Sequence, residues 1–184
     1  MTEQADQLYE RVLVIRCQAG DEAAFAELVA RYHARLRYYA RKMLGEKHSA
    51  EDVLQDVWFD VFRGLARLAD PGAFPAWIYQ ITRARVARQL RRPRPPVQHL
   101  EEDDLAGSAE AEEEFTAEDA ERVHATLDRL SPEHREVLVL RFLEGMSYQD
   151  IARVTGGRLG TVRSRLHYAK RALRDLLERT NLHD

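Results

Sequence analysis

A proline-rich break near the middle of the chain limits it to two short folding units. The run Arg-Arg-Pro-Arg-Pro-Pro occupies residues 91–96 of 184. Proline lacks a backbone N–H and disfavours the helical conformation in the residue before it, so a helix that enters this run should end near Arg92. The stretch that follows is rich in alanine and glutamate and holds few large apolar side chains, which does not favour a packed core. We therefore predict an N-terminal module over residues 1–95, an acidic flexible linker over 96–115 and a C-terminal module over 116–184.

Charge is distributed unevenly along the sequence. Eleven acidic residues and no basic residue lie between Glu101 and Glu121, so a chain of net charge −3 carries +8 outside this stretch. The positive charge gathers in two segments, whose cations are Arg83, Arg85, Arg88, Arg91, Arg92 and Arg94, and then Arg158, Arg163, Arg165, Lys170, Arg171, Arg174 and Arg179. Two basic segments on either side of an acidic one suggest two modules that contact a polyanion such as nucleic acid. Composition alone is equally compatible with solvated helix faces.

The hydrophobic pattern is helical throughout, and no segment reads as a strand. In the N-terminal module, Asp21 is a suitable N-cap, and the sequence from Ser49 to Asp52 has the form of a capping box. Pro75 suits the first turn of a further helix. We predict an all-α fold, with N-terminal helices over about 21–39, 50–68 and 75–90.

The C-terminal module reads as four helices, over about 116–127, 132–143, 148–154 and 160–177. Ser147 opens a second capping box, and Gly145 is placed to end the helix before it. The third of these helices is short, the glycines at 156 and 157 allow a tight turn, and the fourth is long and basic. This succession predicts a helix-turn-helix.

The long basic helix should bury one face and expose the other. Val162, Leu166, Ala169 and Leu173 share the apolar face. The exposed face carries groups that reach base edges and phosphates, namely Arg158, Thr161, Arg163, Ser164, Arg165, His167, Tyr168 and Arg171. We predict that this face contacts DNA. An ordinary helical hairpin with a basic surface is the alternative.

Other classes of protein are disfavoured. The single cysteine, Cys17, rules out an internal disulfide framework and any zinc site built on several cysteines. The sequence shows no catalytic triad pattern, no phosphate-binding glycine loop and no metal-ligand spacing, so we expect no enzyme activity, no cofactor and no metal. We read six histidines as surface residues, namely His33, His48, His99, His124, His134 and His183. No apolar run reaches the roughly 18 residues that cross a membrane. With a polar, acidic N-terminus, this predicts a cytoplasmic protein without membrane insertion.

Segments from both modules resemble one protein family. In the C-terminal module they are Leu130–Arg141, Leu143–Ala152 and Gly160–His167, which look like region 4 of bacterial extracytoplasmic-function (ECF) sigma factors of the sigma-70 family. In the N-terminal module, Gly20–Leu28, Ala50–Trp58 and Ala76–Ile81 look like region 2 of the same family. The segments occur in the family's order and spacing and span nearly all of the chain except its first residues and the acidic linker.

The resemblance implies a factor that binds the bacterial RNA polymerase core and directs promoter-specific transcription initiation. It implies that the C-terminal helix-turn-helix binds the −35 element of promoter DNA. It places polymerase contacts on Asp52, Gln55, Asp56 and Asp60, and contacts to the −10 element on Tyr79, Arg83, Arg85, Arg88, Arg91 and Arg92. An anti-sigma factor is expected as a further partner.

Ala84 departs from the family pattern, because it stands about where the family often has an asparagine that can bond a base edge. We therefore expect the neighbouring arginines to hold the −10 region mainly through phosphates. Trp58 and Trp77 are predicted core residues, whereas Tyr79 fits the core and base stacking equally well.

The residues are also compatible with a second hypothesis, that the chain is a stand-alone helix-turn-helix regulator with an N-terminal helical sensor or dimerisation domain. Such a regulator should show a ligand pocket or bind a palindromic site as a dimer. A nucleic-acid enzyme with helical domains is the third reading, which the missing catalytic pattern disfavours.

Overall fold

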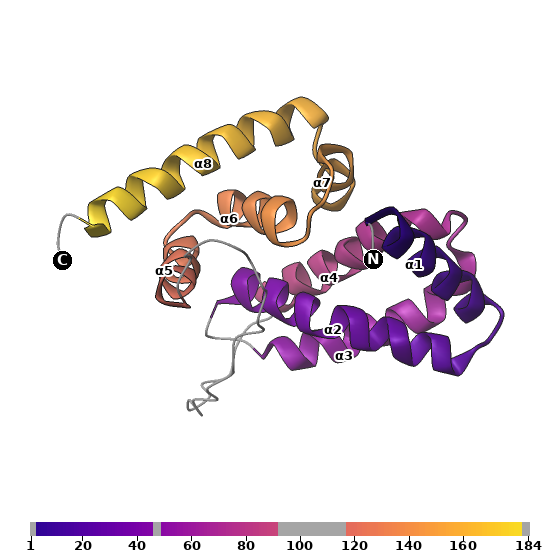
Figure 1. Ribbon diagram of the computed structural model, residues 1–184. Helices are drawn as coiled ribbons and strands as arrows, with labels where there is room; N and C mark the ends of the chain where they lie inside the picture. Colours follow the sequence, from indigo (N-terminus) through magenta and orange to yellow (C-terminus); the bar gives the residue numbers. More distant parts are fainter. Residues whose placement is uncertain (1–2, 46–48, 92–116, 182–184) are drawn as a thin grey trace.

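The computed structural model describes residues 3–45, 49–91 and 117–181, and its described part is helical without a strand (Figure 1). The helices are α1 (Glu3–Gln18), α2 (Glu22–Leu44), α3 (Ala50–Gly64), α4 (Phe74–Leu90), α5 (Ala117–Asp128), α6 (Pro132–Leu138), α7 (Tyr148–Thr155) and α8 (Leu159–Asn181). Two short 3₁₀ turns, η1 (Leu65–Arg67) and η2 (Pro71–Ala73), and one π turn, η3 (Val139–Leu143), complete them. The predicted all-α class is confirmed. The predicted linker, residues 96–115, lies outside the described residues.

Helix starts lie where the sequence predicts them. The side chains of Asp21, Ser49 and Ser147 each accept a hydrogen bond from the backbone N–H three residues later, at 3.1, 3.3 and 3.1 Å. Each bond satisfies one of the donors that the first turn of a helix leaves without a partner. The end of α3 differs from the prediction, because the chain tightens into η1 after Gly64 instead of remaining α-helical to Leu68.

The N-terminal module is built from α1–α4 around a core that includes Leu28, Leu36, Val57 and Ile78, all fully buried. Helix α1 was not predicted. It buries Leu13 and Val14 against this core while Leu8, Val12 and Ile15 remain exposed. Apolar side chains on both faces obscure the single stripe by which a surface helix is recognised in a sequence. The side chain of Gln18 fastens α1 to η1, directly after α3, by donating to the carbonyls of Leu65 and Leu68, at 3.0 and 2.8 Å.

The C-terminal module comprises α5–α8. Its second helix was predicted to run unbroken to Leu143, but after Leu138 it changes into the π turn η3. The widened turn is closed by the backbone N–H of Glu144, which donates to the carbonyl of Val139 at 3.1 Å. Gly145 ends the segment with φ of +66°, a conformation that glycine adopts without steric cost, so the predicted stop is confirmed.

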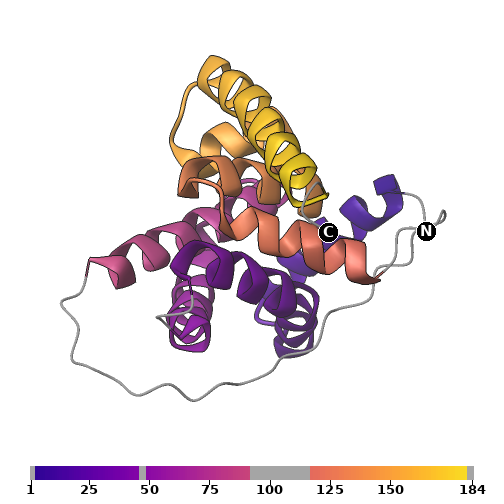
Figure 2. The ribbon, with the colours of Figure 1, turned by 90° about the vertical axis from the view of Figure 1, so that its left-hand side faces the viewer.

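The two modules pack against each other. Helix α7 lies on α4, and α6 lies on α2 (Figures 1 and 2). In both views α5–α8 lie across one side of the N-terminal module. The sequence had indicated two modules with a tether between them, and nothing in it predicted this contact.

Candidate nucleic-acid interface

The predicted helix-turn-helix is formed by α7 and α8. Gly156 adopts the left-handed conformation at the end of α7, with φ of +68° and ψ of 17°, and its backbone N–H donates to the carbonyl of Ala152. The N–H of Gly157 bonds the same carbonyl at 3.1 Å, which closes the turn. Ile151 on α7 and Val162 and Leu166 on α8 are buried where the two helices meet. The turn and this apolar contact fix the orientation of α8.

The opposite face of α8 is open to solvent over its N-terminal half. This face and Arg158, just before the helix, expose all but one of the side chains that the sequence predicted to contact the −35 element, the others being Thr161, Arg163, Ser164, His167, Tyr168 and Arg171. Tyr168 is 58% exposed and makes an edge contact with the ring of His167. A helix with this exposed basic face is suited to the major groove of DNA.

Arg165 differs from its neighbours because it already has a partner. Its Nη2 lies 3.0 Å from Oε2 of Glu133 at the start of α6, and its side chain is 23% exposed. The Glu133 side chain is 69% exposed, so this ion pair is in contact with water and contributes little to stability. A DNA acceptor can therefore replace Glu133 at small cost.

The arginines of α4 are in three different environments. Arg88 is exposed and Arg91 follows the helix end, also exposed, and neither makes an ion pair within the described residues. The side chain of Arg85 binds two carboxylates of α3, with Nη2 2.5 Å from Asp60 and Nη1 3.1 Å from Asp56. Nε of Arg83 donates to Glu136 of the C-terminal module at 2.8 Å. Arg92, also predicted to contact DNA, lies outside the described residues.

Tyr79, which was predicted to contact the −10 element, is fully buried in this arrangement. Its ring packs edge-on against Tyr39 of α2, with ring centroids 5.3 Å apart. Its hydroxyl is buried without a hydrogen bond of ordinary geometry, and burial, together with the nearby charge of Glu144, raises the pKa of Tyr79 well above its usual value. Tyr79 therefore offers no stacking surface in this arrangement. Trp58 and Trp77 pack partly buried against the core, as predicted.

The predicted polymerase-contacting face of α3 is largely exposed. Asp52, Gln55 and Asp56 are open to solvent, whereas Asp60 is partly covered by Arg85. The first three border a polar hollow of about 260 Å³ between α3 and α4, whose opposite side is formed by Arg85, Arg88 and Gln89. The sequence did not indicate that Arg85, assigned to DNA, would bind the carboxylates assigned to polymerase.

A second hollow lies within the C-terminal module. It is an open apolar groove of about 460 Å³ between α5, α6, η3 and α8. Its floor and walls are formed by Val123, Leu127, Leu138, Phe142, Leu143, Leu173 and Leu177, with Lys170, Arg174 and Glu178 at the rim. Phe142 is 61% exposed and Leu143 47%. An exposed apolar surface with a charged rim is typical of a protein-binding site.

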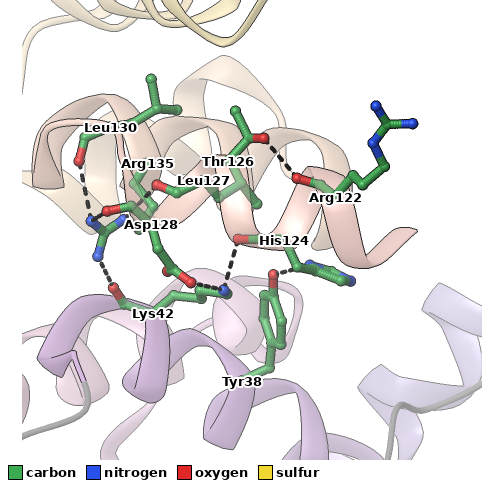
Figure 3. A network of polar contacts seen from close by, with 9 residues as sticks. All are labelled: Tyr38, Lys42, Arg122, His124, Thr126, Leu127, Asp128, Leu130 and Arg135. Atoms are coloured by element: carbon green, nitrogen blue, oxygen red, sulfur yellow. Dashed lines mark hydrogen bonds and ion pairs between the residues drawn. The ribbon is translucent and has the colours of Figure 1, made fainter. Parts of the chain in front are cut away.

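His124, read from the sequence as a surface residue, is half-buried at the contact between α5 and α2 (Figure 3). The hydroxyl of Tyr38 is 2.6 Å from its Nδ1. Burial, with a smaller contribution from the nearby charge of Lys42, lowers the pKa of His124 below 6.5. Burial of His124 between α5 and α2 therefore favours the neutral form of its ring. Nothing in the local sequence signals this role, because the partner lies 86 residues away.

Among the described helices, none combines the length and the apolar character that crossing a membrane requires.

Models of two protein families match the chain. The model described as "Sigma-70 region 2" matches residues 28–94, which cover most of α2 and all of α3 and α4. The model described as "Sigma-70, region 4" matches residues 120–173, from α5 into α8. The two matches contain the acidic face of α3, the arginines of α4 and the helix-turn-helix.

Individual relatives match over most of the chain. The chain is 32% identical to the RNA polymerase sigma-H factor of Pseudomonas aeruginosa, over 96% of this chain and 95% of that one. It is 36% identical to the ECF RNA polymerase sigma factor SigE of Mycolicibacterium smegmatis, over 86% of this chain, and it spans 64% of that longer protein. Among solved structures, CnrH in complex with the cytosolic domain of CnrY is similar with a TM-score of 0.67 and 28% identity, over 92% of this chain and 97% of that one.

Proposed function

The chain belongs to the ECF sigma factors of the sigma-70 family, and from this membership we propose that it binds the bacterial RNA polymerase core and directs it to promoters through separate −10 and −35 surfaces. The observation that carries this proposal is the exposed basic face of α8, held by a helix-turn-helix, in the same chain as the exposed acidic face of α3. One face is chemically suited to DNA and the other to a basic protein surface.

On this proposal each module has its own task. Residues 1–95 form the region 2 module, in which α3 docks on polymerase through Asp52, Gln55, Asp56 and Asp60. Exposed Arg88 and Arg91 hold the phosphates of the −10 element, whereas Arg83 and Arg85, two further predicted contacts, are shared with carboxylates in this arrangement. Residues 116–184 form the region 4 module, which reads the −35 element. The protein acts as an initiation factor in the cytoplasm and performs no chemistry of its own.

An anti-sigma factor is the second protein partner that we propose. One similar solved structure is a complex of this kind in its title, the sigma factor RpoE with the anti-sigma factor NepR from Bartonella quintana, at 22% identity and a TM-score of 0.65. CnrH, in the other similar structure, is in complex with the cytosolic domain of a second protein, CnrY. On this chain the apolar groove beside Phe142 supports a protein partner, because it can bury apolar side chains that the chain alone leaves exposed.

The direct test is transcription with purified components. We expect the full chain, added to RNA polymerase core that lacks a sigma factor, to produce transcripts that start at defined promoters. Core alone should produce none of these transcripts. A stand-alone regulator would instead protect a palindromic DNA site as a dimer in a footprinting experiment without polymerase. Footprinting of that kind, with no transcript, would overturn the proposal.

Arg165 is expected to read a base in the −35 element. A bidentate arginine–guanine pair contributes about 1–3 kcal/mol of discrimination, more than the exposed pair with Glu133 contributes. When a library of −35 sequences is selected with the Arg165→Ala variant, we expect the preference at one base position to relax. The control is Lys170→Ala, farther along α8, which should weaken binding to all sequences alike or leave it unchanged. An unchanged base preference with normal affinity would remove Arg165 from the DNA-binding site.

A further inference from the structure

Two carboxylates of the C-terminal module are buried at its contact with the N-terminal module. The side chain of Glu136 on α6 is 7% exposed and that of Glu144, after η3, is 3% exposed. A charge removed from water is costly unless it is paired and hydrogen-bonded. The N-terminal module supplies the partners, because Glu136 and Glu144 are bound there by arginines 53 and 109 residues away in the sequence.

The two sites are similar in composition. Oε1 of Glu136 accepts a hydrogen bond from the Tyr39 hydroxyl at 2.7 Å and from Nε of Arg83 at 2.8 Å. Oε2 of Glu144 accepts from Nε of Arg35 at 2.8 Å. We call these five residues the carboxylate latch. Burial and the adjacent charge of Glu136 raise the pKa of Tyr39 well above its usual value, so the hydroxyl remains a donor to the carboxylate.

The end of α2 forms a second attachment, beside the turn between α5 and α6 (Figure 3). Nζ of Lys42 binds the Asp128 carboxylate at 2.7 Å and the carbonyl of His124 at 3.0 Å. The guanidinium of Arg135 donates to the carbonyl of Lys42. It also donates to the carbonyls of three residues at the turn, Leu127, Asp128 and Leu130. Arg135 thus holds α5 and α6 together and fastens the pair to α2.

The packed arrangement covers part of the surface proposed for the −10 element. Arg83 is bound by the latch, and Tyr79 is buried. One turn before Arg83, Gln80 of α4 is also engaged, because its Nε2 donates to the carbonyl of Arg153 on α7 at 2.8 Å. A carboxylate and a phosphate are alternative acceptors for the same guanidinium. Glu136 therefore occupies Nε of Arg83, one of the donors of a bidentate phosphate contact, while the side chain of Arg83 is still 42% exposed.

We propose that the chain on its own rests in a closed, self-inhibited state, in which the carboxylate latch holds the C-terminal module over α4 and Glu136 competes with promoter DNA for Arg83. This inference rests on the proposed function, since it assigns Arg83 to the −10 element. When a DNA phosphate replaces Glu136 on Arg83 and the C-terminal module moves away from α4, Glu136 returns to water, so no buried charge is left without a partner. The exchange therefore avoids the main cost of breaking a buried ion pair. Contacts of this kind between domains of one chain are expected to permit relative motion.

The test for closure uses the full chain without polymerase or DNA. We expect Glu136→Gln combined with Glu144→Gln to raise the ratio of open to closed molecules about ten- to hundredfold, since a hydrogen bond to a charged group contributes about 1.5–3 kcal/mol. Small-angle X-ray scattering should show a larger radius of gyration than in the wild type. The matched control, Glu121→Gln with Asp175→Asn, removes two exposed carboxylates outside the latch and should remain as compact as the wild type.

A second pair of variants tests the latch from the N-terminal module and does not depend on how well the first one folds. Arg83→Gln removes the cation that Glu136 binds, whereas Arg88→Gln removes an exposed cation of the same helix that the latch does not use. We expect Arg83→Gln to open the chain and Arg88→Gln to leave it closed, with unchanged helix content by circular dichroism in both. Scattering that is identical to the wild type for Arg83→Gln and for the double glutamate variant would overturn the latch.

Binding to promoter DNA in complex with core polymerase separates failure of the latch from failure of the proposed function. The double glutamate variant should form this complex with an apparent affinity about tenfold higher or more, because a closed chain binds only through its open fraction. Arg88→Gln leaves the latch intact, so it should weaken the complex only through the lost phosphate contact, whereas Arg83→Gln combines a lost contact with an opened latch. If Arg83→Gln opens the free chain but Arg88→Gln leaves the complex unchanged, the latch stands and the −10 assignment fails. If Arg88→Gln weakens the complex while every latch variant stays compact, the function stands and the latch fails.

Discussion

Replacing Val162 with aspartate is expected to unfold the C-terminal module and to abolish −35 recognition. Val162 is 1% exposed at the contact between the two helices of the helix-turn-helix. The substitution forfeits about 1.5–3 kcal/mol of apolar burial and forces a carboxylate without a partner into the core, which costs several kcal/mol more. A core of this size rarely supplies more than about 3–5 kcal/mol. Amide hydrogen exchange in the full chain should show α6–α8 unprotected while α2–α4 stay protected.

The adjacent residue provides the control. Thr161 is exposed, and it lies in the first turn of α8, where a carboxylate interacts favourably with the helix dipole. Thr161→Asp should therefore keep the module folded and reduce only its affinity for DNA. Normal protection of α6–α8 in the Val162→Asp variant would contradict the burial on which the helix-turn-helix assignment depends.

Reversing the charge of Asp56 is expected to reduce affinity for core polymerase about a hundredfold or more. On the proposed function this carboxylate meets a basic surface, and like charges facing one another across an interface cost several kcal/mol. The N-terminal module should remain folded in Asp56→Lys, because Arg85 keeps its bond to Asp60 at 2.5 Å and Asp56 is 54% exposed. A pull-down with core polymerase gives the affinity, and a thermal unfolding curve gives the stability.

Glu51 lies on the same helix with a side chain 56% exposed, and it is not among the predicted polymerase contacts. Glu51→Lys makes the same change of charge and should leave core affinity near the wild-type value. Equal losses for Glu51→Lys and Asp56→Lys would indicate a general dependence on the acidity of α3. Full affinity in both variants would mean that polymerase docks elsewhere.

Much of the fold could be predicted from the sequence because its signals are local. A capping residue bonds a backbone N–H three positions away, as Ser49 and Ser147 do, and helical periodicity can be counted within a single segment. The exposed face of α8 followed from the same periodicity, because Val162, Leu166 and Ala169 all had to point inward.

The features that the sequence did not predict depend on pairs of residues that lie far apart in the chain. No pattern near Glu136 indicates that it is buried, because its partners are 97 and 53 residues earlier in the chain. A glutamate on a helix is ordinarily read as a solvated charge. For the same reason the sequence did not indicate the pairing of Arg85 with Asp56 and Asp60, or the place of His124 against Tyr38. The position of a charged side chain depends on how the helices pack, and the local sequence does not show that packing.

The buried contact of Glu136 with Tyr39 and Arg83 also limits which modules are interchangeable in a chimeric chain. A C-terminal module exchanged from a relative that lacks this glutamate would leave the Tyr39 hydroxyl facing a surface without an acceptor. An N-terminal module that lacks Arg83 would leave the glutamate with less of the charge that offsets its burial. On the proposed function, a substitution on the outer face of α8 can change DNA contacts without disturbing this contact, whereas an exchange of whole modules disturbs it.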